Sequence, residues 1–479
     1  MPIATLLSRS AVLLATSMLL GAAPAPTPPR AAMPPPDNQK LAHDIFRDIV
    51  EVRSVHDVGT KAVADILVRY LKANGFAAGD IHELADPKYP NQMNVVVRLH
   101  GKTRAKPVLW YGHMDVVEAR PEDWSLPPFK FTEKDGYFYG RGTSDMKDQD
   151  AATAASLIRL KTEGFVPGRD IIVAFTADEE VGEEEDGLWY LLRDHRDLVD
   201  AEMLINPDGD SGELKDGRRL DFGVETSEKT YATFTLEATN RGGHSSEPRP
   251  DNAIYQLANA LVRLSKYSFP YKTNATTRLY FAKQAELEQG QRRADMLALA
   301  NNGTVTDAAS ATRLARDVPL NAILHTTCVA TMLAAGHQEN ALPQRAQATV
   351  QCRIFPDESV EQTRATLAKV IADPAISVKA LGLITFAPES PPTPKLMASV
   401  EKVVHSMWPG VPVLPEMAAG ASDSIFARNA GIPAYGISGG WIDVHDIRAH
   451  GRDERREKNA FYESVEFTYR LMKELSKAP

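Results

Sequence analysis

Cysteine is nearly absent from this 479-residue sequence: only Cys328 and Cys352 occur, which excludes a fold held together by a framework of disulfides. Positive charge is also in deficit, since 54 Lys and Arg against 63 Asp and Glu give a formal net charge of −9. This balance provides no electrostatic footprint for nucleic acid or for an anionic membrane surface. Peptides and small molecules are the expected partners, and neither nucleic acid nor stable membrane insertion is expected.

A dinucleotide-binding turn, Gly-x-Gly-x-x-Gly after a strand, is missing as well, which argues against a dinucleotide cofactor. With 43% hydrophobic and 24% charged residues, the composition is that of an ordinary globular protein. The chain is longer than one hydrophobic core usually supports, so we expect at least two domains.

The N-terminus predicts export. One positive charge within residues 1–9 precedes the apolar run 11–23, which ends in small residues and is typical of a signal peptide spanning 1–25. The run is short for a bilayer-spanning helix, so a retained anchor is the weaker alternative. A proline-rich leader, 26–37, follows. We expect a periplasmic or secreted protein, in which Cys328 and Cys352 either pair or remain buried free thiols.

The rest of the chain predicts an α/β catalytic domain with an inserted lid. Strands alternate with amphipathic helices through residues 38–227, which favours a mostly parallel sheet. The segment 228–388 predicts an α+β lid and dimerisation domain with helices on one face of its sheet, although its polar helical part, 285–317, has no assigned place. The α/β pattern returns over 389–479. The acidic run 183–186 is expected to form a solvated face.

Polar residues collect where the predicted strands end. Ligands of open α/β sheets lie beyond the carboxyl ends of the strands, and four strands here deliver imidazole or carboxylate groups to that edge. One further carboxylate follows a glycine-rich turn. The set is His113, Asp115, Asp145, Glu179, Glu180, Asp208 and His450.

These side chains suit a pair of metal ions. Nitrogen and carboxylate ligands without thiolate favour Zn²⁺, with Co²⁺ or Mn²⁺ as alternatives. Two imidazoles and three carboxylates are enough for two ions that share a bridging carboxylate, and such a pair activates water against a carbonyl group. The adjacent Glu179 and Glu180 can divide the work of base and ligand. Asp210 competes with Asp208 as a ligand, and His445 competes with His450.

Five ordered motifs resemble the M20 metallopeptidase family: Gly112-His-Met-Asp115, Gly140-Arg-Gly-Thr-Ser-Asp-Met-Lys147, Ala177-Asp-Glu-Glu180, Gly242-Gly-His-Ser245 and the distal His450. The resemblance implies that one zinc is held by His113, Asp145 and Asp208. It implies that the other is held by Asp145, as the bridge, with Glu180 and His450. Asp115 would orient His113, and Glu179 would be the general base.

The resemblance also assigns three residues of the lid. His244 would stabilise the oxyanion, in this family commonly across the interface of a homodimer formed through the lid. Arg353, in Cys352-Arg-Ile-Phe-Pro356, matches an arginine that grips the substrate carboxylate. Asn340, in Asn340-Ala-Leu-Pro343, matches an asparagine near the substrate.

The leading hypothesis is therefore an exported zinc hydrolase that cleaves an amide bond next to a free carboxylate, as a carboxypeptidase or dipeptidase. An N-acyl-amino-acid amidohydrolase would use the same site. A non-catalytic zinc or peptide binder on the same scaffold would have no need of a base, yet Glu179 is present.

Overall fold

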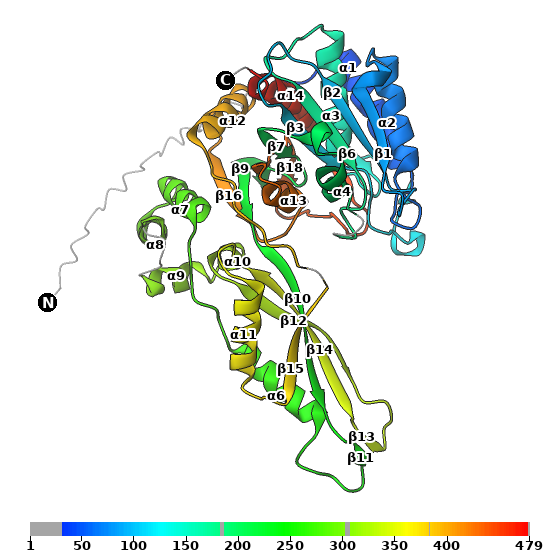
Figure 1. Ribbon diagram of the computed structural model, residues 1–479. Coiled ribbons are helices and arrows are strands. Elements are labelled where there is room, and N and C mark those ends of the chain that lie inside the picture. The colour runs from blue at the N-terminus through cyan, green and yellow to red at the C-terminus, as the bar shows by residue number, and fades with distance from the viewer. Residues whose placement is uncertain (1–30, 183–185, 302–306, 383, 478–479) are drawn as a thin grey trace, which may run out of the picture. The chain divides into compact units, whose positions relative to one another are not determined.

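The computed structural model describes residues 31–182, 186–301, 307–382 and 384–477 (Figure 1). The predicted signal peptide and most of the leader lie outside these residues, as do Glu183, Glu184 and Glu185 of the acidic run. The chain divides into residues 1–31 and 32–479, and every element below belongs to the second unit.

The central element is a sheet that the described residues build from ten strands, in the order β1-β2-β6-β3-β7-β17-β9-β8-β18, with β16 also paired to β9. The predicted α/β class with a mostly parallel sheet is confirmed. Five strand pairs are parallel, namely β6-β3, β3-β7, β7-β17, β16-β9 and β18-β8, whereas β1-β2, β2-β6, β17-β9 and β8-β9 are antiparallel. The strands are β1 (Ile81–Ala85), β2 (Met93–Leu99), β3 (Val108–His113), β6 (Ile171–Thr176), β7 (Met203–Asn206), β8 (Gly212–Lys215), β9 (Arg218–Glu228), β16 (Val413–Ala418), β17 (Ala434–Gly436) and β18 (Trp441–Asp443).

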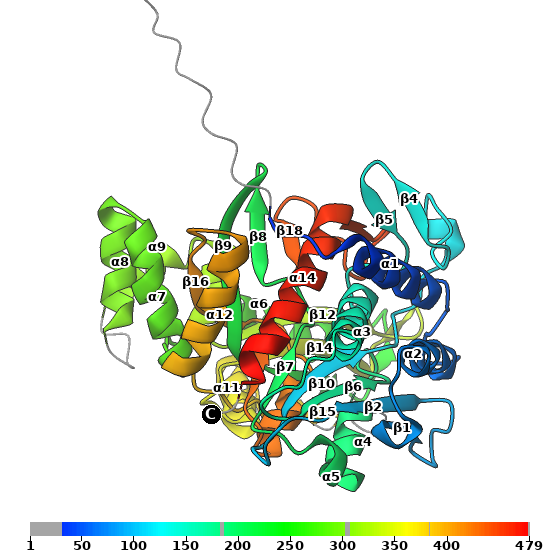
Figure 2. The ribbon, with the colours of Figure 1, turned by 90° about the horizontal axis from the view of Figure 1, so that it is seen from above.

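Helices cover both faces of this sheet (Figure 2). One face carries α1 (Pro36–Val50), α3 (Lys147–Thr162), α12 (Pro394–Met407) and α14 (Lys458–Leu475), and the other carries α4 (Gly187–Asp194), α5 (Arg196–Val199) and α13 (Ser424–Asn429). In α1 the buried residues Ala42, Ile45, Phe46 and Ile49 recur at helical spacing, which gives the helix a single apolar face. α2 (Lys61–Ala73) packs on α1 and β2 beside them.

Residues 212–228 and 413–418 form strands that the sequence pattern did not indicate. β9 begins with Arg218-Arg-Leu-Asp, and its first four residues are exposed or half-buried. Only its second half enters the core, where Phe222 and Val224 are buried. A strand whose polar half lies outside the sheet core has neither the alternation nor the apolar run by which strands are recognised.

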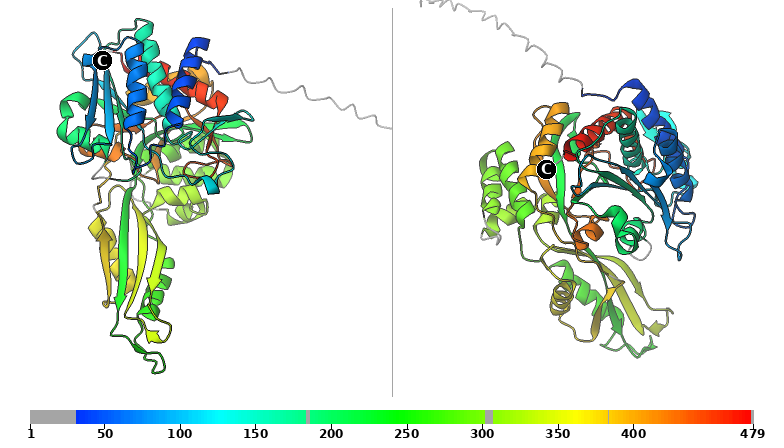
Figure 3. Two further views of the ribbon diagram at one scale, coloured as in Figure 1. Left: turned by 90° about the vertical axis from the view of Figure 1, so that its right-hand side faces the viewer. Right: turned by 45° about the horizontal axis from the view of Figure 1, so that its top comes forward.

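A second, four-stranded sheet forms the lid, in the order β12-β14-β10-β15 (Figure 3). Its helices α6 (Ala253–Ser265) and α11 (Val360–Ile371) lie on one face, as predicted. Alternate residues of β10, from Ala232 to Ala238, point into the core beneath them. The strands are β10 (Thr230–Thr239), β12 (Thr327–Ala335), β14 (Arg345–Ile354) and β15 (Ile376–Leu381), with the short pair β11 (Gly243–His244) and β13 (Ala341–Leu342) beyond them.

The two cysteines form a disulfide. Cys328 of β12 and Cys352 of β14 are direct partners in the register of the lid sheet, and the bond joins these neighbouring strands. Of the two alternatives left open by the sequence, pairing is therefore the one adopted.

The helical segment that the sequence could not place forms a small core of its own. Four helices bury Phe281, Met296, Leu314 and Leu324 against one another, and α7 packs on β16 of the central sheet. Side chains at the end of β9 and at Lys229, the residue between β9 and β10, contact this segment, including Lys229 Nζ to the carbonyl of Ala322 at 2.7 Å. The helices are α7 (Ala275–Leu287), α8 (Gly290–Ala300), α9 (Ala308–Leu314) and α10 (Val318–Leu324).

A three-stranded sheet, β19-β5-β4, completes the catalytic part with β4 (Thr132–Lys134), β5 (Tyr137–Tyr139) and β19 (Arg455–Glu457). The short 3-10 helices span Ala78–Asp80 and Pro121–Asp123. Within the described residues, no helix combines the length and apolarity needed to cross a membrane. The domain limits 38–227, 228–388 and 389–479 remain predictions.

Candidate metal centre and active site

The candidate site begins at the carboxyl ends of three adjacent strands. β3 lies between β6 and β7 and runs parallel to both, so the residues that follow these strands meet at one edge of the sheet. His113 is the last residue of β3. The loop after β6 brings Glu179 and Glu180, and the loop after β7 brings Asp208.

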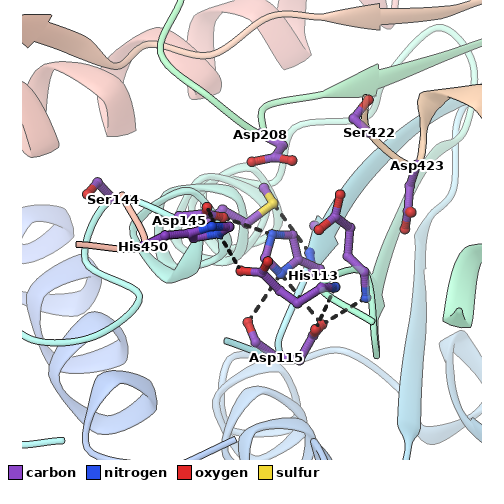
Figure 4. A network of polar contacts seen from close by, with 12 residues as sticks. His113, Asp115, Ser144, Asp145, Asp208, Ser422, Asp423 and His450 are labelled. Atoms are coloured by element: carbon purple, nitrogen blue, oxygen red, sulfur yellow. Dashed lines mark hydrogen bonds and ion pairs between the residues drawn. The ribbon is translucent and has the colours of Figure 1, made fainter. Parts of the chain in front are cut away.

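Asp145 lies between two imidazoles (Figure 4). Its Oδ1 is 3.1 Å from Nε2 of His113, and its Oδ2 is 2.9 Å from Nε2 of His450. The same nitrogen of His450 is 3.0 Å from Oε1 of Glu180. One carboxylate therefore faces both histidines, which is the arrangement that a bridging ligand requires.

Two overlapping groups of potential ligand atoms result. Side-chain atoms of His113, Asp145 and Glu180 all lie within 4.8 Å of one another, and so do those of His113, Glu179 and Asp208. The donors are imidazole nitrogen and carboxylate oxygen, so the residues present fit Zn²⁺, Co²⁺ or Mn²⁺ chemically. Several carboxylates packed this closely also need compensating positive charge, which divalent ions would provide.

Asp115 holds both sides of this cluster together. The carbonyl oxygen of Asp115 is 3.2 Å from Nδ1 of His113, and its carboxylate is 3.5 Å from the same atom. The carboxylate also accepts hydrogen bonds from the backbone N–H groups of Glu179, at 3.3 Å, and Glu180, at 3.1 Å. Nδ1 is thereby engaged and Nε2 of His113 is left to act as a ligand. The contact agrees with the orienting role predicted for Asp115, which stays a prediction.

The close packing of acids and imidazoles shifts the pKa values of both kinds of group. Burial raises the pKa of Glu179 well above its usual value, and the charges of Asp423, Asp208 and Glu180 add to this. Burial, together with the charge of Asp145, raises the pKa of Asp208 to about 7. These carboxyl groups lie close together and repel one another.

The pKa values of the two imidazoles rise. Hydrogen bonds to Asp145 and Glu180 raise the pKa of His450 to about 10. Burial works to lower the pKa of His113, but its contacts with Asp115 and Asp145 outweigh burial and raise the pKa well above the usual range. For Asp145, burial is outweighed by the hydrogen bonds from His113 and His450, and its pKa is lowered.

Two loop residues at the site have left-handed backbone conformations. Asp178, directly before Glu179, has φ of 60°, and His450 has φ of 61°. Non-glycine residues rarely adopt such angles, and they tend to do so where the surrounding structure fixes a functional side chain.

The two rival ligands lie outside the cluster. Asp210 is bound by Arg456, whose Nη1 is 2.6 Å from its Oδ1. His445 is exposed, and its backbone N–H donates to Asp443 at 2.9 Å. The structure thus brings Asp208 and His450 to the site and leaves Asp210 and His445 out of it.

A serine-hydrolase pattern, Gly436-Ile-Ser-Gly-Gly440, also follows a strand of the central sheet, so its serine is a rival nucleophile. Ser438 is buried, and its hydroxyl accepts hydrogen bonds from the N–H groups of Ser211 and Gly440. Across the described ranges, no histidine lies within hydrogen-bond distance of this hydroxyl. The serine therefore braces a turn.

The predicted lid residues separate into two places. His244 pairs with Ala341 across β11 and β13, and the carbonyl of Asn340 accepts from the N–H of Ser245 at 3.0 Å, so His244 and Asn340 are neighbours. Arg353 lies at the other end of β14, roughly 26 Å from Arg345 at about 3.3 Å per residue. In one chain, His244 and Arg353 therefore mark opposite ends of the lid sheet.

Arg353 is a cation without a partner anion. Its guanidinium stacks over the ring of Tyr231 at 4.7 Å, and within the described part of the chain it makes no hydrogen bond or ion pair. Burial lowers its pKa. The neighbouring Lys229 is buried too, and burial together with the charge of Arg353 lowers the pKa of Lys229 to about 7. Two basic side chains thus lie together at the base of the lid.

Two acidic residues, Asp186 and Asp423, lie near the site although the sequence did not predict them there. Asp186 was expected on a solvated face, but it is buried, caps α4 through the N–H of Trp189 at 2.6 Å and contacts Asp423. The expectation was wrong because a helix cap must lie close to the helix whose N–H groups it binds. Asp423 accepts a hydrogen bond from Tyr111 at 2.5 Å. The Asp-Gly-Leu sequence at 186–188 was the available signal for the cap.

Comparison with known proteins decides the family. A model of peptidase family M20/M25/M40 matches residues 109–474. The chain belongs to this family. As an M20 chain it is a hydrolase that acts on amide bonds, and the resemblance drawn from its motifs is confirmed.

Relatives of this M20 chain include peptidases and acyl-amino-acid hydrolases. It is 29% identical to an N-fatty-acyl-amino acid synthase/hydrolase of Xenopus tropicalis, over 76% of this chain and 72% of that protein. It is also 29% identical to a probable carboxypeptidase S-like protein of Dictyostelium discoideum, over 78% and 72%. Its fold matches an M20 family metallo-carboxypeptidase of Sulfolobus solfataricus with a TM-score of 0.69 and 18% identity, over 91% and 99%.

Proposed function

We propose that this protein is an exported di-zinc hydrolase that cleaves an amide bond next to a free carboxylate, as a carboxypeptidase or dipeptidase. The observation that carries the proposal is the placement of Asp145 between His113 and His450, with Glu180 beside His450 and Asp208 grouped with His113. In this proposal, His113, Asp145 and Asp208 hold one Zn²⁺, and Asp145, Glu180 and His450 hold the second.

When bound, two such ions polarise the scissile carbonyl group and lower the pKa of the attacking water. The Glu179 carboxylate then accepts a proton from that water and passes it to the departing nitrogen. Its backbone is fixed for this by the hydrogen bond to Asp115. His244 donates a hydrogen bond to the oxyanion. Arg353 binds the free carboxylate of the substrate, and Asn340 contacts the substrate beside His244.

The second candidate is an N-acyl-amino-acid amidohydrolase, favoured by the similarity to the Xenopus tropicalis hydrolase. Both candidates require a free carboxylate on the substrate and differ in the group on the other side of the amide. A panel of dipeptides and N-acyl amino acids of matched C-terminal residue, from acetyl to long-chain acyl, separates them by kcat/KM. Faster turnover of dipeptides supports the first candidate, and faster turnover of acyl amino acids contradicts it.

Arg353→Met should weaken carboxylate binding. A hydrogen-bonded charge pair contributes about 1.5–3 kcal/mol, so kcat/KM should fall by roughly 10- to 150-fold, mainly through KM. For substrates with an amidated C-terminus, kcat/KM should be the same in the variant as in the wild-type protein. Arg345→Met, at the far end of the same strand, is the matched control, because Arg345 pairs with Glu237 and should be dispensable. Equal losses on free and amidated substrates would contradict this role for Arg353.

We further propose a homodimer formed through the lid. The edge strand β12 exposes Met332 and Leu333, at 68% and 67%, beside a row of unpaired backbone groups. An apolar edge strand of this kind is a template for pairing with another chain. A second copy docked on this strand would bring its own His244 to the active site of the first chain. This would explain why His244 and Arg353 of one chain lie far apart.

A complementation experiment tests this arrangement. Glu179→Gln and His244→Ala chains should each be nearly inactive alone, whereas co-expressed chains form heterodimers in which one of two sites has both groups. At random pairing, about a quarter of wild-type activity should return. Adding Leu333→Lys to both chains should give monomers and remove the recovery. Absence of recovery between dimeric variants would show that His244 serves its own chain or no chain.

Export of the protein is supported by the Cys328–Cys352 disulfide. Such bonds persist in the periplasm and outside the cell, where the compartment is oxidising. Fractionation of cells producing the full-length chain, with N-terminal sequencing of the product, tests both export and cleavage within residues 20–30.

A further inference from the structure

Two buried arginines connect the three loops that carry the proposed ligands Asp145, Asp208 and His450. Arg141 precedes Asp145 in the turn between β5 and α3, and Arg456 follows His450 by six residues, in β19. Both guanidinium groups are almost completely inaccessible, and so are the carboxylates that they contact. Charged groups are placed in such positions only with close partners, because removing them from water is costly.

The first arginine links the Asp145 turn to the His450 loop. Arg141 Nη1 donates to Oε2 of Glu454 at 2.5 Å, and Nη2 donates to the carbonyl oxygen of His450 at 3.3 Å. The other oxygen of Glu454 accepts from the N–H of Ser144 at 2.7 Å, one residue before Asp145. Glu454 thus binds both the turn on which Asp145 lies and the arginine that contacts His450.

The second arginine adds the loop after β7. Arg456 Nη1 is 2.6 Å from Oδ1 of Asp210, two residues after Asp208, and its Nε is 2.9 Å from Oδ2 of Asp148 in the first turn of α3. Its Nη2 donates to the carbonyl of Ser144 at 3.5 Å. The space for Asp210 exists only because residue 440 is glycine, since a Cβ there would lie 1.9 Å from Asp210 Oδ1.

The loops joined in this way are far apart in sequence. Asp145, Asp208 and His450 lie outside the β-strands, so no hydrogen bonds of a β-sheet hold them in place. The carboxylate of Asp208 is also repelled by those of Asp145 and Glu180, which would spread these loops if nothing held them. Partners outside the ligand set commonly fix ligand orientation and change metal affinity by about 10- to 100-fold when they are lost.

We propose that Arg456 and the Arg141–Glu454 pair are positioning residues, which hold Asp145, Asp208 and His450 at ligating distance before metal binds. This inference rests on the proposed function, because it takes those three residues as ligands. It also gives Asp210 a definite role: it is the anchor of the Asp208 loop rather than a ligand.

The test compares Arg456→Lys with wild-type, full-length protein, because lysine keeps the charge and loses the planar fork that contacts two loops and the first turn of α3. Apo proteins are titrated with Zn²⁺ against a chelating dye, and with Co²⁺ while its visible absorption is recorded. We expect Zn²⁺ affinity about 10- to 100-fold lower in the variant, with an altered Co²⁺ spectrum. Circular dichroism and urea unfolding of the apo proteins establish that the variant is folded.

Arg159→Lys is the matched control. Arg159 lies on α3, the helix that carries Asp148, pairs with the buried Glu466 at 2.7 Å and is far along the helix from Asp145. Its loss should leave Zn²⁺ affinity and the Co²⁺ spectrum unchanged. If Arg456→Lys does not fold, Glu454→Gln carries the test with the same expected loss, because it retains the shape of the side chain.

A folded Arg456→Lys protein with wild-type Zn²⁺ affinity and Co²⁺ spectrum would overturn the inference and leave the proposed function intact. An equal loss in Arg159→Lys would also overturn it, since any buried ion pair would then have the same effect. A wild-type protein that binds neither ion would overturn the proposed function and, with it, the inference.

Discussion

Replacing Asp145 with asparagine is expected to lower kcat/KM by about 10³- to 10⁴-fold, because metal activation of the carbonyl and of water contributes several kcal/mol. Each oxygen of this carboxylate faces a different imidazole, that of His113 or that of His450. An amide retains only one oxygen and presents a non-ligating NH₂ group to the other position. Bound Zn²⁺ should fall well below two per chain, as measured by mass spectrometry on the intact protein.

Asp443→Asn is the control for that change. Asp443 belongs to the loop of the rival histidine His445 and lies outside both groups of ligand atoms. It should keep its zinc and its activity. Full metal content in Asp145→Asn would contradict the bridging role, and an equal loss in Asp443→Asn would show that the loop as a whole matters.

Glu179→Gln should lower kcat by about 10²- to 10⁴-fold and leave Zn²⁺ content and KM nearly unchanged. Glutamine fills the same space but cannot accept the proton of the attacking water. Stopped-assay kinetics on a dipeptide, together with metal analysis of the same sample, measure both quantities.

The adjacent Glu180 provides the contrast. Its Oε1 is 3.0 Å from His450 and it belongs to the group with Asp145, so Glu180→Gln should lose activity together with metal. The two variants would then differ: Glu179→Gln would lose activity alone, and Glu180→Gln would lose both activity and zinc. If Glu179→Gln retained zinc and a wild-type kcat, the base would have to be another group.

The ligand cluster could be anticipated from sequence because each member has a local signal. His113 ends a buried strand, and Glu179 and Asp208 lie within three residues of the ends of two others. Parallel neighbouring strands must end at the same edge of a sheet. What the pattern left open was which of two nearby residues reaches the centre. That choice, between Asp208 and Asp210, depends on Arg456, which is 246 residues away from Asp210 along the chain.

Contacts between residues far apart in the sequence cannot be predicted from any local sequence pattern. The contact between Arg141 and Glu454 joins positions 313 residues apart, and the burial of Asp186 depends on α4 folding against the sheet. The sequence of the helices beside Lys229 predicts only polar helices, because their small core forms only when they pack together. Hydrophobic periodicity predicts which face of a helix or strand is apolar, but it does not predict which other element packs against that face.

The central claim is that side chains from separate loops gather around two metal ions. X-ray diffraction from crystals of the Zn²⁺-loaded protein, recorded above and below the zinc absorption edge, tests it most directly. We expect two anomalous peaks about 3.5–4 Å apart, with Asp145 between them, His113 and Asp208 on one and Glu180 and His450 on the other. A single peak, or peaks away from Asp145, would contradict it.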